Sequence, residues 1–213
     1  MFKKIGISIV IFCVSSVVAF ADTMLPYLGG EIGYDTGRWR LKDVTSIKTT
    51  ENANGAFGGL FAGLSWTLAP QFVVGTEIFG NEASTSTSNQ QINIANGGTS
   101  QASLRVKYSY GGSLLPSFKF NEAAMIYLRA GIIRSQFQLH QVIPPTGAGS
   151  TWSKNNVGGG QFGVGVQGDV GELRNWGVRG EYDYVTYNSF TAFGNSISAR
   201  DNQFKVGVLY NFY

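Results

Sequence analysis

The chain has 213 residues, of which 14% are charged, 14% are aromatic and 29 are glycine. Soluble domains usually contain about 25% charged residues, so this composition disfavours a helical bundle and suits repeated, half-buried strands. The formal net charge of +3 is too small to indicate a nucleic-acid-binding protein.

The first 21 residues predict a secretory signal peptide. Two lysines open the segment, residues 5–18 are apolar, and Ala19 and Ala21 form a small-x-small cleavage pattern. The apolar stretch is short for a transmembrane helix of about 20 residues, so a membrane anchor is the less favoured alternative. Cleavage would remove Cys13, the only cysteine, and would leave residues 22–213 as one domain.

Eight segments of that domain alternate apolar and polar side chains with a period of two, as strands with unlike faces do. One face carries aliphatic and aromatic residues, and the other carries glycine, serine, glutamine and charge. In chain order, the segments span residues 27–35, 55–68, 72–81, 103–116, 125–135, 161–170, 176–185 and 205–213.

The connections between these segments alternate in length. They are short after the second, fourth and sixth segments, and long and polar elsewhere, and residues 81–101 are nearly low-complexity and expected to be mobile. This pattern predicts an all-β fold, an eight-stranded antiparallel up-and-down transmembrane β-barrel with short periplasmic turns and long extracellular loops. Because backbone groups in hydrocarbon need internal partners, the last strand must pair with the first.

A soluble β-sandwich or a lipocalin-like barrel is the alternative fold. Such a barrel would fill its interior with bulky apolar side chains. Here the face opposite the aliphatic residues is small, polar or charged, which favours a polar lumen and an apolar exterior.

Three segments resemble the eight-stranded outer-membrane barrels, namely the transmembrane domain of outer membrane protein A and the opacity-type surface proteins. They are "GAFGG" at residues 55–59, "YLRAG" at residues 127–131 and "GVRGEYDY" at residues 177–184. The resemblance implies a monomeric barrel in the outer membrane of a Gram-negative bacterium, in contact with the bilayer and its lipopolysaccharide. The chain ends with the barrel, so no peptidoglycan-binding domain is expected after it.

The terminal "KVGVLYNF" is similar to the C-terminal signal that the outer-membrane assembly machinery reads in such barrels. That signal has a polar residue, a glycine and two aromatic residues at fixed spacing. Lys205, Gly207, Tyr210 and Phe212 match it.

Charged residues at inward positions are nearly balanced in sign. Since an unpaired charge in a narrow interior is costly, we expect ion pairs across the lumen, with Glu77 near Arg105 and Lys107, and Lys205 near Glu181 and Glu31. The resemblance assigns Arg129, Arg179 and Glu181 to such a network. The expected network residues are Glu31, Glu77, Arg105, Lys107, Arg129, Arg179, Glu181 and Lys205, and Asp169 and Asp183 share their face.

The network could be a structural plug or the gate of a narrow ion path. An eight-stranded barrel is just wide enough to be filled by its own side chains, which favours the plug. Aromatic residues at strand ends are expected at the two membrane interfaces. They are Trp66, Phe72, Trp176, Tyr210 and Phe212 on the turn side, and Trp39, Phe137, Tyr187 and Phe190 on the loop side.

These features predict an integral outer-membrane barrel with a role in envelope integrity and in adhesion or binding of a host or surface ligand through its loops. A small porin-like channel is the alternative, and a lipid A-modifying enzyme comes third. The single histidine, His140, has Ser135 as its nearest serine in sequence and no compact catalytic pattern. No catalytic residue, metal site or cofactor motif is expected.

Overall fold

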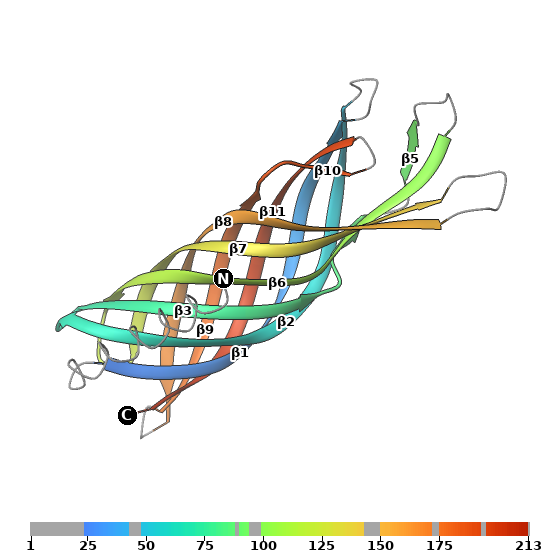
Figure 1. Cartoon of the computed structure of the whole chain (residues 1–213). Helices are drawn as coiled ribbons and strands as arrows, with labels where there is room; N and C mark the ends of the chain where they lie inside the picture. Colours follow the sequence, from blue (N-terminus) through green and yellow to red (C-terminus); the bar gives the residue numbers. More distant parts are fainter. Residues whose placement is uncertain are drawn as a thin grey trace, which may run out of the picture.

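A computed structural model shows an all-β chain that winds up and down around a single axis (Figure 1). It describes residues 24–42, 48–87, 90–93, 99–142, 150–171, 175–192 and 195–212. The predicted signal peptide, with Ala19 and Ala21, lies outside the described residues. Among the residues that are described, no helix is long and apolar enough to cross a membrane.

The described residues form eight long strands and three short ones. The long strands are β1 Met24–Lys42, β2 Lys48–Ala69, β3 Phe72–Ala83, β6 Thr99–Lys119, β7 Ala124–Val142, β8 Ser150–Val170, β9 Trp176–Tyr187 and β11 Asn195–Asn211. The short strands are β4 Ser86–Thr87, β5 Gln90–Asn93 and β10 Phe190–Ala192.

The eight long strands close into a ring. They follow the order β1, β11, β9, β8, β7, β6, β3 and β2, and β2 pairs again with β1. The β1–β11 ladder runs from Tyr27 opposite Asn211 to Lys42 opposite Ser196, and the amide of Phe212 donates to the carbonyl of Pro26 at 2.9 Å. The expected pairing of the last strand with the first is therefore confirmed.

Most of the strands are longer than the sequence pattern suggests. Strands β1, β2, β6, β7 and β8 have 19 to 22 residues, about twice the 9–11 that a tilted strand needs to cross a bilayer. The extra length lies at the long-loop end, where β6, β7 and β8 project beyond the ring (Figure 1). Parts of the expected loops are thus strands, and the low-complexity stretch contains β4 and β5.

The barrel has an apolar exterior. Ile32, Leu60 and Ile132 are 71%, 68% and 74% exposed, whereas Glu31 and Arg129, on the opposite face of β1 and β7, are buried. This arrangement suits a ring that meets hydrocarbon on the outside.

A β-bulge in β6 reverses the facing of its outer part. Val106 lies opposite Phe137 and Ser109 lies opposite Ser135, so β6 has one extra residue between these pairs. Consequently Leu104 and Val106 point inward, with 2% and 3% of their surface exposed. The expectation that Arg105 and Lys107 face the lumen is therefore wrong, because both are exposed on the outer face.

Candidate functional site: a charged lumen beneath an apolar plug

A cluster of seven charged side chains crosses the middle of the lumen. Each occupies an inward position of a strand, because alternate residues of a strand share a face. All seven are buried. They are Glu31 of β1, Glu77 of β3, Arg129 of β7, Arg179, Glu181 and Asp183 of β9, and Lys205 of β11.

Glu77 is the centre of one half of the network. Its Oε1 lies 2.7 Å from Nη2 of Arg129, and its Oε2 lies 2.6 Å from Nη1 of Arg179. The hydroxyl of Tyr27 also donates to Oε2 at 3.2 Å. Arg179 continues the network to Glu31, with 2.7 Å between Nη2 and Oε2.

Glu181 is the centre of the other half. Arg129 reaches it with Nε at 2.9 Å from Oε1, and the hydroxyl of Tyr127 donates to Oε2 at 2.8 Å. Lys205 contacts Glu181 and places Nζ 2.5 Å from Oδ2 of Asp183. Since Arg129 bonds both glutamates, it joins the two halves into one network.

Aromatic rings and small residues make room for these charges. The guanidinium carbon of Arg179 lies 3.5 Å from the ring centroid of Phe61, within the range of a cation–π contact. A Cβ atom on Gly163 would lie 1.7 Å from Oδ1 of Asp183, so only glycine leaves space for that carboxylate.

The structure brings together six of the eight residues that the sequence assigned to this network. The two others, Arg105 and Lys107, lie outside, where Arg105 donates to Oε1 of Gln138 at 2.8 and 3.0 Å. Glu77 is paired instead with the two arginines described above. Sequence reasoning missed the tyrosine donors Tyr27 and Tyr127, although strand alternation places both on the inward face.

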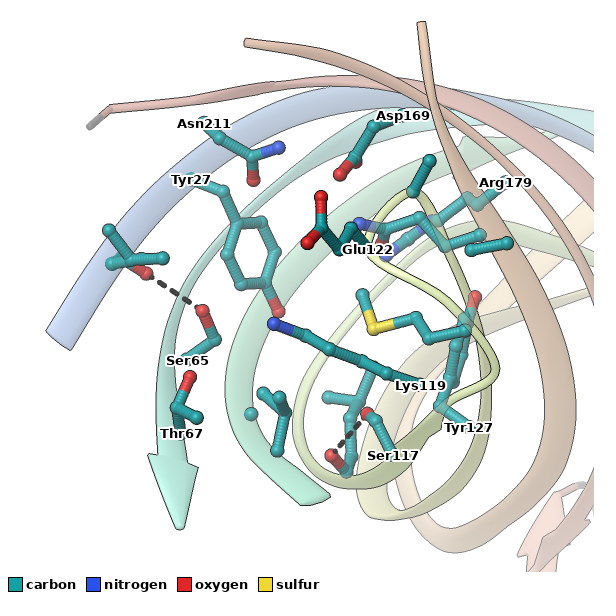
Figure 2. A pocket seen from close by; sticks show the side chains of 18 of the residues that line it. Tyr27, Ser65, Thr67, Ser117, Lys119, Glu122, Tyr127, Asp169, Arg179 and Asn211 are labelled. Carbon is teal, nitrogen blue, oxygen red and sulfur yellow. Dashed lines mark hydrogen bonds between the residues drawn. The ribbon is translucent and has the colours of Figure 1, made fainter. Parts of the chain in front are cut away.

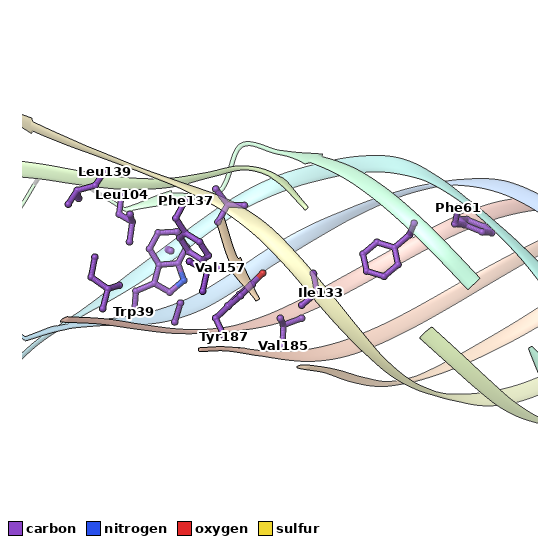
Figure 3. Close-up of a cluster of buried hydrophobic side chains, with 14 of the residues drawn as sticks. Trp39, Phe61, Leu104, Ile133, Phe137, Leu139, Val157, Val185 and Tyr187 are labelled. Atoms are coloured by element: carbon purple, nitrogen blue, oxygen red, sulfur yellow. The ribbon is translucent and has the colours of Figure 1, made fainter. Parts of the chain in front are cut away.

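An apolar plug fills the lumen on the long-loop side of the network (Figure 3). Phe137 is at its centre, 5.5 Å from the ring of Trp39, 5.1 Å from Tyr187 and 5.2 Å from Phe190. The Nε1 of Trp39 donates to Oδ1 of Asp201 at 2.8 Å. Further members include Leu104, Val106, Ile133, Leu139, Val157, Val185 and Ile197.

The aromatic residues expected at the membrane interface on the loop side belong to this plug instead. Trp39, Phe137 and Tyr187 are buried inside the barrel, and Phe190 packs against them. The reason is physical: strands that extend past the bilayer are surrounded by water, so their apolar residues turn inward as in a soluble protein. On the turn side, Phe72, Trp176 and Phe212 lie exposed on the outer surface, as the sequence indicates.

A small vestibule opens below the network, at the short-turn end (Figure 2). It encloses about 90 Å³ and is lined by polar groups that include Lys119, Glu122 and Asp169. Tyr127 and Arg179 of the network form its inner boundary. A space of this size holds a small number of water molecules, since one water needs about 10–15 Å³ of such volume.

The described residues contain no group of three His, Cys, Asp or Glu side chains placed to hold a metal ion. His140 lies on the projecting part of β7, and the residue opposite it on β6 is Ser103 rather than Ser135. The chemistry that the lumen supports is mutual neutralisation of charge, because Glu31, Glu77, Glu181 and Asp183 each lie within ion-pair distance of an arginine or lysine.

Comparison with family models matches residues 7–212 to the outer membrane protein β-barrel domain. The attachment invasion locus protein Ail of Yersinia pestis aligns with a TM-score of 0.43 and 14% identity over 87% of this chain and 98% of that one. The outer membrane protease OmpT of Escherichia coli aligns with a TM-score of 0.50 and 10% identity over 88% and 97%. The search of curated proteins found no match.

Proposed function

Because the chain belongs to the family of outer membrane β-barrel proteins and lies in the outer membrane of a Gram-negative bacterium, we propose that it is a closed barrel that supports the envelope and mediates adhesion through its extracellular part. The proposal also includes export by a cleaved signal peptide over residues 1–21, insertion of residues 22–213 by the assembly machinery, and a monomeric state. It includes no enzymatic activity and no cofactor.

The length of the strands carries the proposal. Five strands of 19 to 22 residues extend well past the span that a bilayer requires. The plug packs the inside of this extension, which gives the loops a rigid base. Loops held on rigid scaffolds are common sites of binding, so a host or surface ligand is the expected partner of this region.

A small porin-like channel is the competing function. The vestibule favours a channel, because its polar lining reaches the edge of the network. The network and the plug oppose it, because together they fill the lumen with ion pairs and packed rings. A lipid A-modifying enzyme has less support, since the pair of His140 and Ser103 lies on the projecting strands.

Conductance and cell binding together test the proposal. Refolded protein in planar bilayers should give no steady openings, and bacteria that display it should bind cells or matrix proteins. Replacing residues 88–98 by a short Gly-Ser linker should abolish that binding, whereas replacing the turn residues 121–123 should not. Steady openings that change with Arg129→Ala, with no loss of binding from the loop replacement, would instead establish a channel.

A further inference from the structure

A buried carboxylate borders the apolar plug. Asp201 of β11 is buried, and its Oδ1 accepts the hydrogen bond that Nε1 of Trp39 donates at 2.8 Å. Trp39 is itself part of the plug (Figure 3). The same oxygen of Asp201 lies over Gly37 of β1, where a Cβ atom would be 2.1 Å from it. Glycine therefore makes room for Asp201 at this point of β1.

A second buried carboxylate lies close to the first. Asp35 precedes Gly37 by two residues, so it shares the inward face of β1 with Gly37. Two residues of a strand span roughly 7 Å, and the Asp201 carboxylate lies over Gly37, so the two acidic groups are near neighbours. The hydroxyl of Thr85 donates to Oδ2 of Asp35 at 2.6 Å. Each carboxylate thus has a neutral hydrogen-bond donor beside it.

Acidic groups outnumber cations around Asp201. Among the described residues, no ion pair includes Asp201 or Asp35. Lys205 faces the same lumen, but Glu181 and Asp183 bind it. The titratable groups that face Asp201 are Asp35 of β1, Glu51 of β2, Asp183 and Tyr187 of β9, and Lys205 of its own strand. Strands β3, β4, β6, β7, β8 and β10 present uncharged side chains to the plug, which are Ala83, Thr87, Ser109, Ser135, Val157 and Phe190.

Asp201 lies outside the hydrocarbon of the membrane. The outward apolar side chains of β11 occupy residues 204–212, a stretch as long as the 9–11 residues that a tilted strand needs to cross a bilayer. Beyond it, Arg200 and its partner Arg38 on β1 are exposed. Burial in this water-surrounded part of the barrel raises the pKa of Asp201 to about 7. The negative charge of Asp35 adds to the rise, and the hydrogen bond from Trp39 opposes it.

We propose that Asp201 is a pH-sensitive switch that keeps the plug closed when it is protonated and opens the plug when it ionises. The protonated carboxyl is neutral and keeps the hydrogen bond from Trp39. The ionised form places a charge among apolar side chains and beside Asp35, which costs free energy unless water reaches it. The projecting strands are therefore held rigidly in mild acid and more loosely in mild alkali. The inference does not depend on the proposed adhesion.

The indole N–H signal of Trp39 reports the state of Asp201 directly. The full chain is refolded in detergent micelles with ¹⁵N-labelled tryptophan, and Trp39→Phe assigns the signal. In wild type the signal should shift with pH, with a midpoint at about 7. Asp201→Asn keeps an acceptor for the indole and should abolish the shift, whereas Asp35→Asn should move the midpoint to lower pH. A signal that does not titrate, or that titrates equally in Asp201→Asn, would overturn the proposal.

Urea unfolding measures how the switch acts on stability. The carboxyl has a pKa of about 7 in the folded protein and an ordinary value of 3.8 in the unfolded chain, so the folded state binds the proton more tightly. Its stabilising effect is therefore present in acid and is lost as the pH rises through 7. Between about pH 6 and pH 8, the folding equilibrium constant of wild type should fall about tenfold more than that of Asp201→Asn. An equal fall in both proteins would contradict the proposal.

Hydrogen exchange tests whether the plug opens. At about pH 8, peptides that cover residues 195–201 should exchange faster in wild type than in Asp201→Asn, and at about pH 5 the two should exchange alike. Comparing the proteins at one pH cancels the intrinsic effect of pH on exchange. The control is Glu82→Gln, which neutralises an exposed carboxylate of β3 and should behave as wild type. Equal exchange of wild type and Asp201→Asn at about pH 8, or an equal effect of Glu82→Gln, would overturn the proposal.

Discussion

Glu77 accepts contacts from three donors in the centre of the lumen: Arg129, Arg179 and Tyr27. With Glu31, Glu181 and Asp183 it makes four carboxylates that face three cations, Arg129, Arg179 and Lys205. Buried ion pairs repay their desolvation only when the geometry is good and further hydrogen bonds satisfy the remaining atoms. The two tyrosine hydroxyls supply such bonds here, so the network is sensitive to the loss of any one member.

We expect Glu77→Ala to destabilise the barrel strongly. The change leaves Arg129 with Glu181 at 2.9 Å and Asp183 at 3.9 Å, and it leaves Arg179 with Glu31, in a space that solvent barely reaches. Removing one partner of a buried ion pair costs on the order of 3–5 kcal/mol. Urea unfolding of the refolded protein in lipid vesicles measures this difference in the free energy of unfolding.

The control for Glu77→Ala is Lys107→Ala. Sequence reasoning placed Lys107 beside Glu77, but the structure places it exposed on the outer face. An exposed substitution of this kind usually changes stability by no more than about 0.5 kcal/mol. If the two variants shifted the urea midpoint equally, the pairing described for the lumen would be incorrect.

At the scale of the strand, alternation is enough to predict most of the fold. It assigned Glu31, Arg129 and Lys205 to the inward face because a period of two fixes the face of every residue once one is known. The same rule failed for Arg105 and Lys107. A bulge adds one residue without a sequence signal that alternation can detect, and every residue beyond it then changes face.

The bulge predicts an unusual tolerance to deletion. Deleting Lys107 should remove the extra residue of β6, so that Val106 and Ser109 still face inward opposite Phe137 and Ser135. We therefore expect this deletion variant to fold, with retention of heat-modifiable migration in gels. Deleting Leu114, in the regular part of β6, should prevent folding, because it turns the residues on one side of the deletion to the wrong face. Failure of both variants would show that the bulge itself is required.

At the scale of the whole molecule, the barrel meets two environments along its axis, hydrocarbon in the membrane band and water beyond it. In the membrane band the interior is charged and the exterior apolar, with Arg129 inside and Ile132 outside. Beyond the band the interior is apolar, with Trp39 and Phe137 inside and Arg38 outside. Sequence reasoning applied the membrane rule to the whole length of each strand. It therefore placed the plug residues at the interface, although their inward position is what an aqueous surrounding requires.

The C-terminal strand β11 closes the ring and also carries the proposed assembly signal. Tyr210 and Phe212 are in ring contact at 5.1 Å on the outer surface, and Tyr210 also contacts Trp176 at 5.2 Å. Neither side chain is needed for the backbone ladder with β1. Purified Tyr210→Ala/Phe212→Ala protein should therefore still fold in detergent, with a modest loss of stability from the two missing rings.

In cells, the same double variant should accumulate less folded protein in the outer membrane and be degraded in the periplasm, because the assembly machinery would read a weakened signal. The control is Val206→Ala/Val208→Ala, which removes exposed apolar side chains from the same strand but keeps the matched positions Lys205, Gly207, Tyr210 and Phe212. Comparing folded protein in outer-membrane fractions with refolding yields in detergent distinguishes the two effects. If Tyr210 and Phe212 are part of an assembly signal, the aromatic variant must assemble worse than the valine variant in cells, while both refold equally well in detergent. Equal assembly would leave the aromatic pair with a role in lipid contact alone.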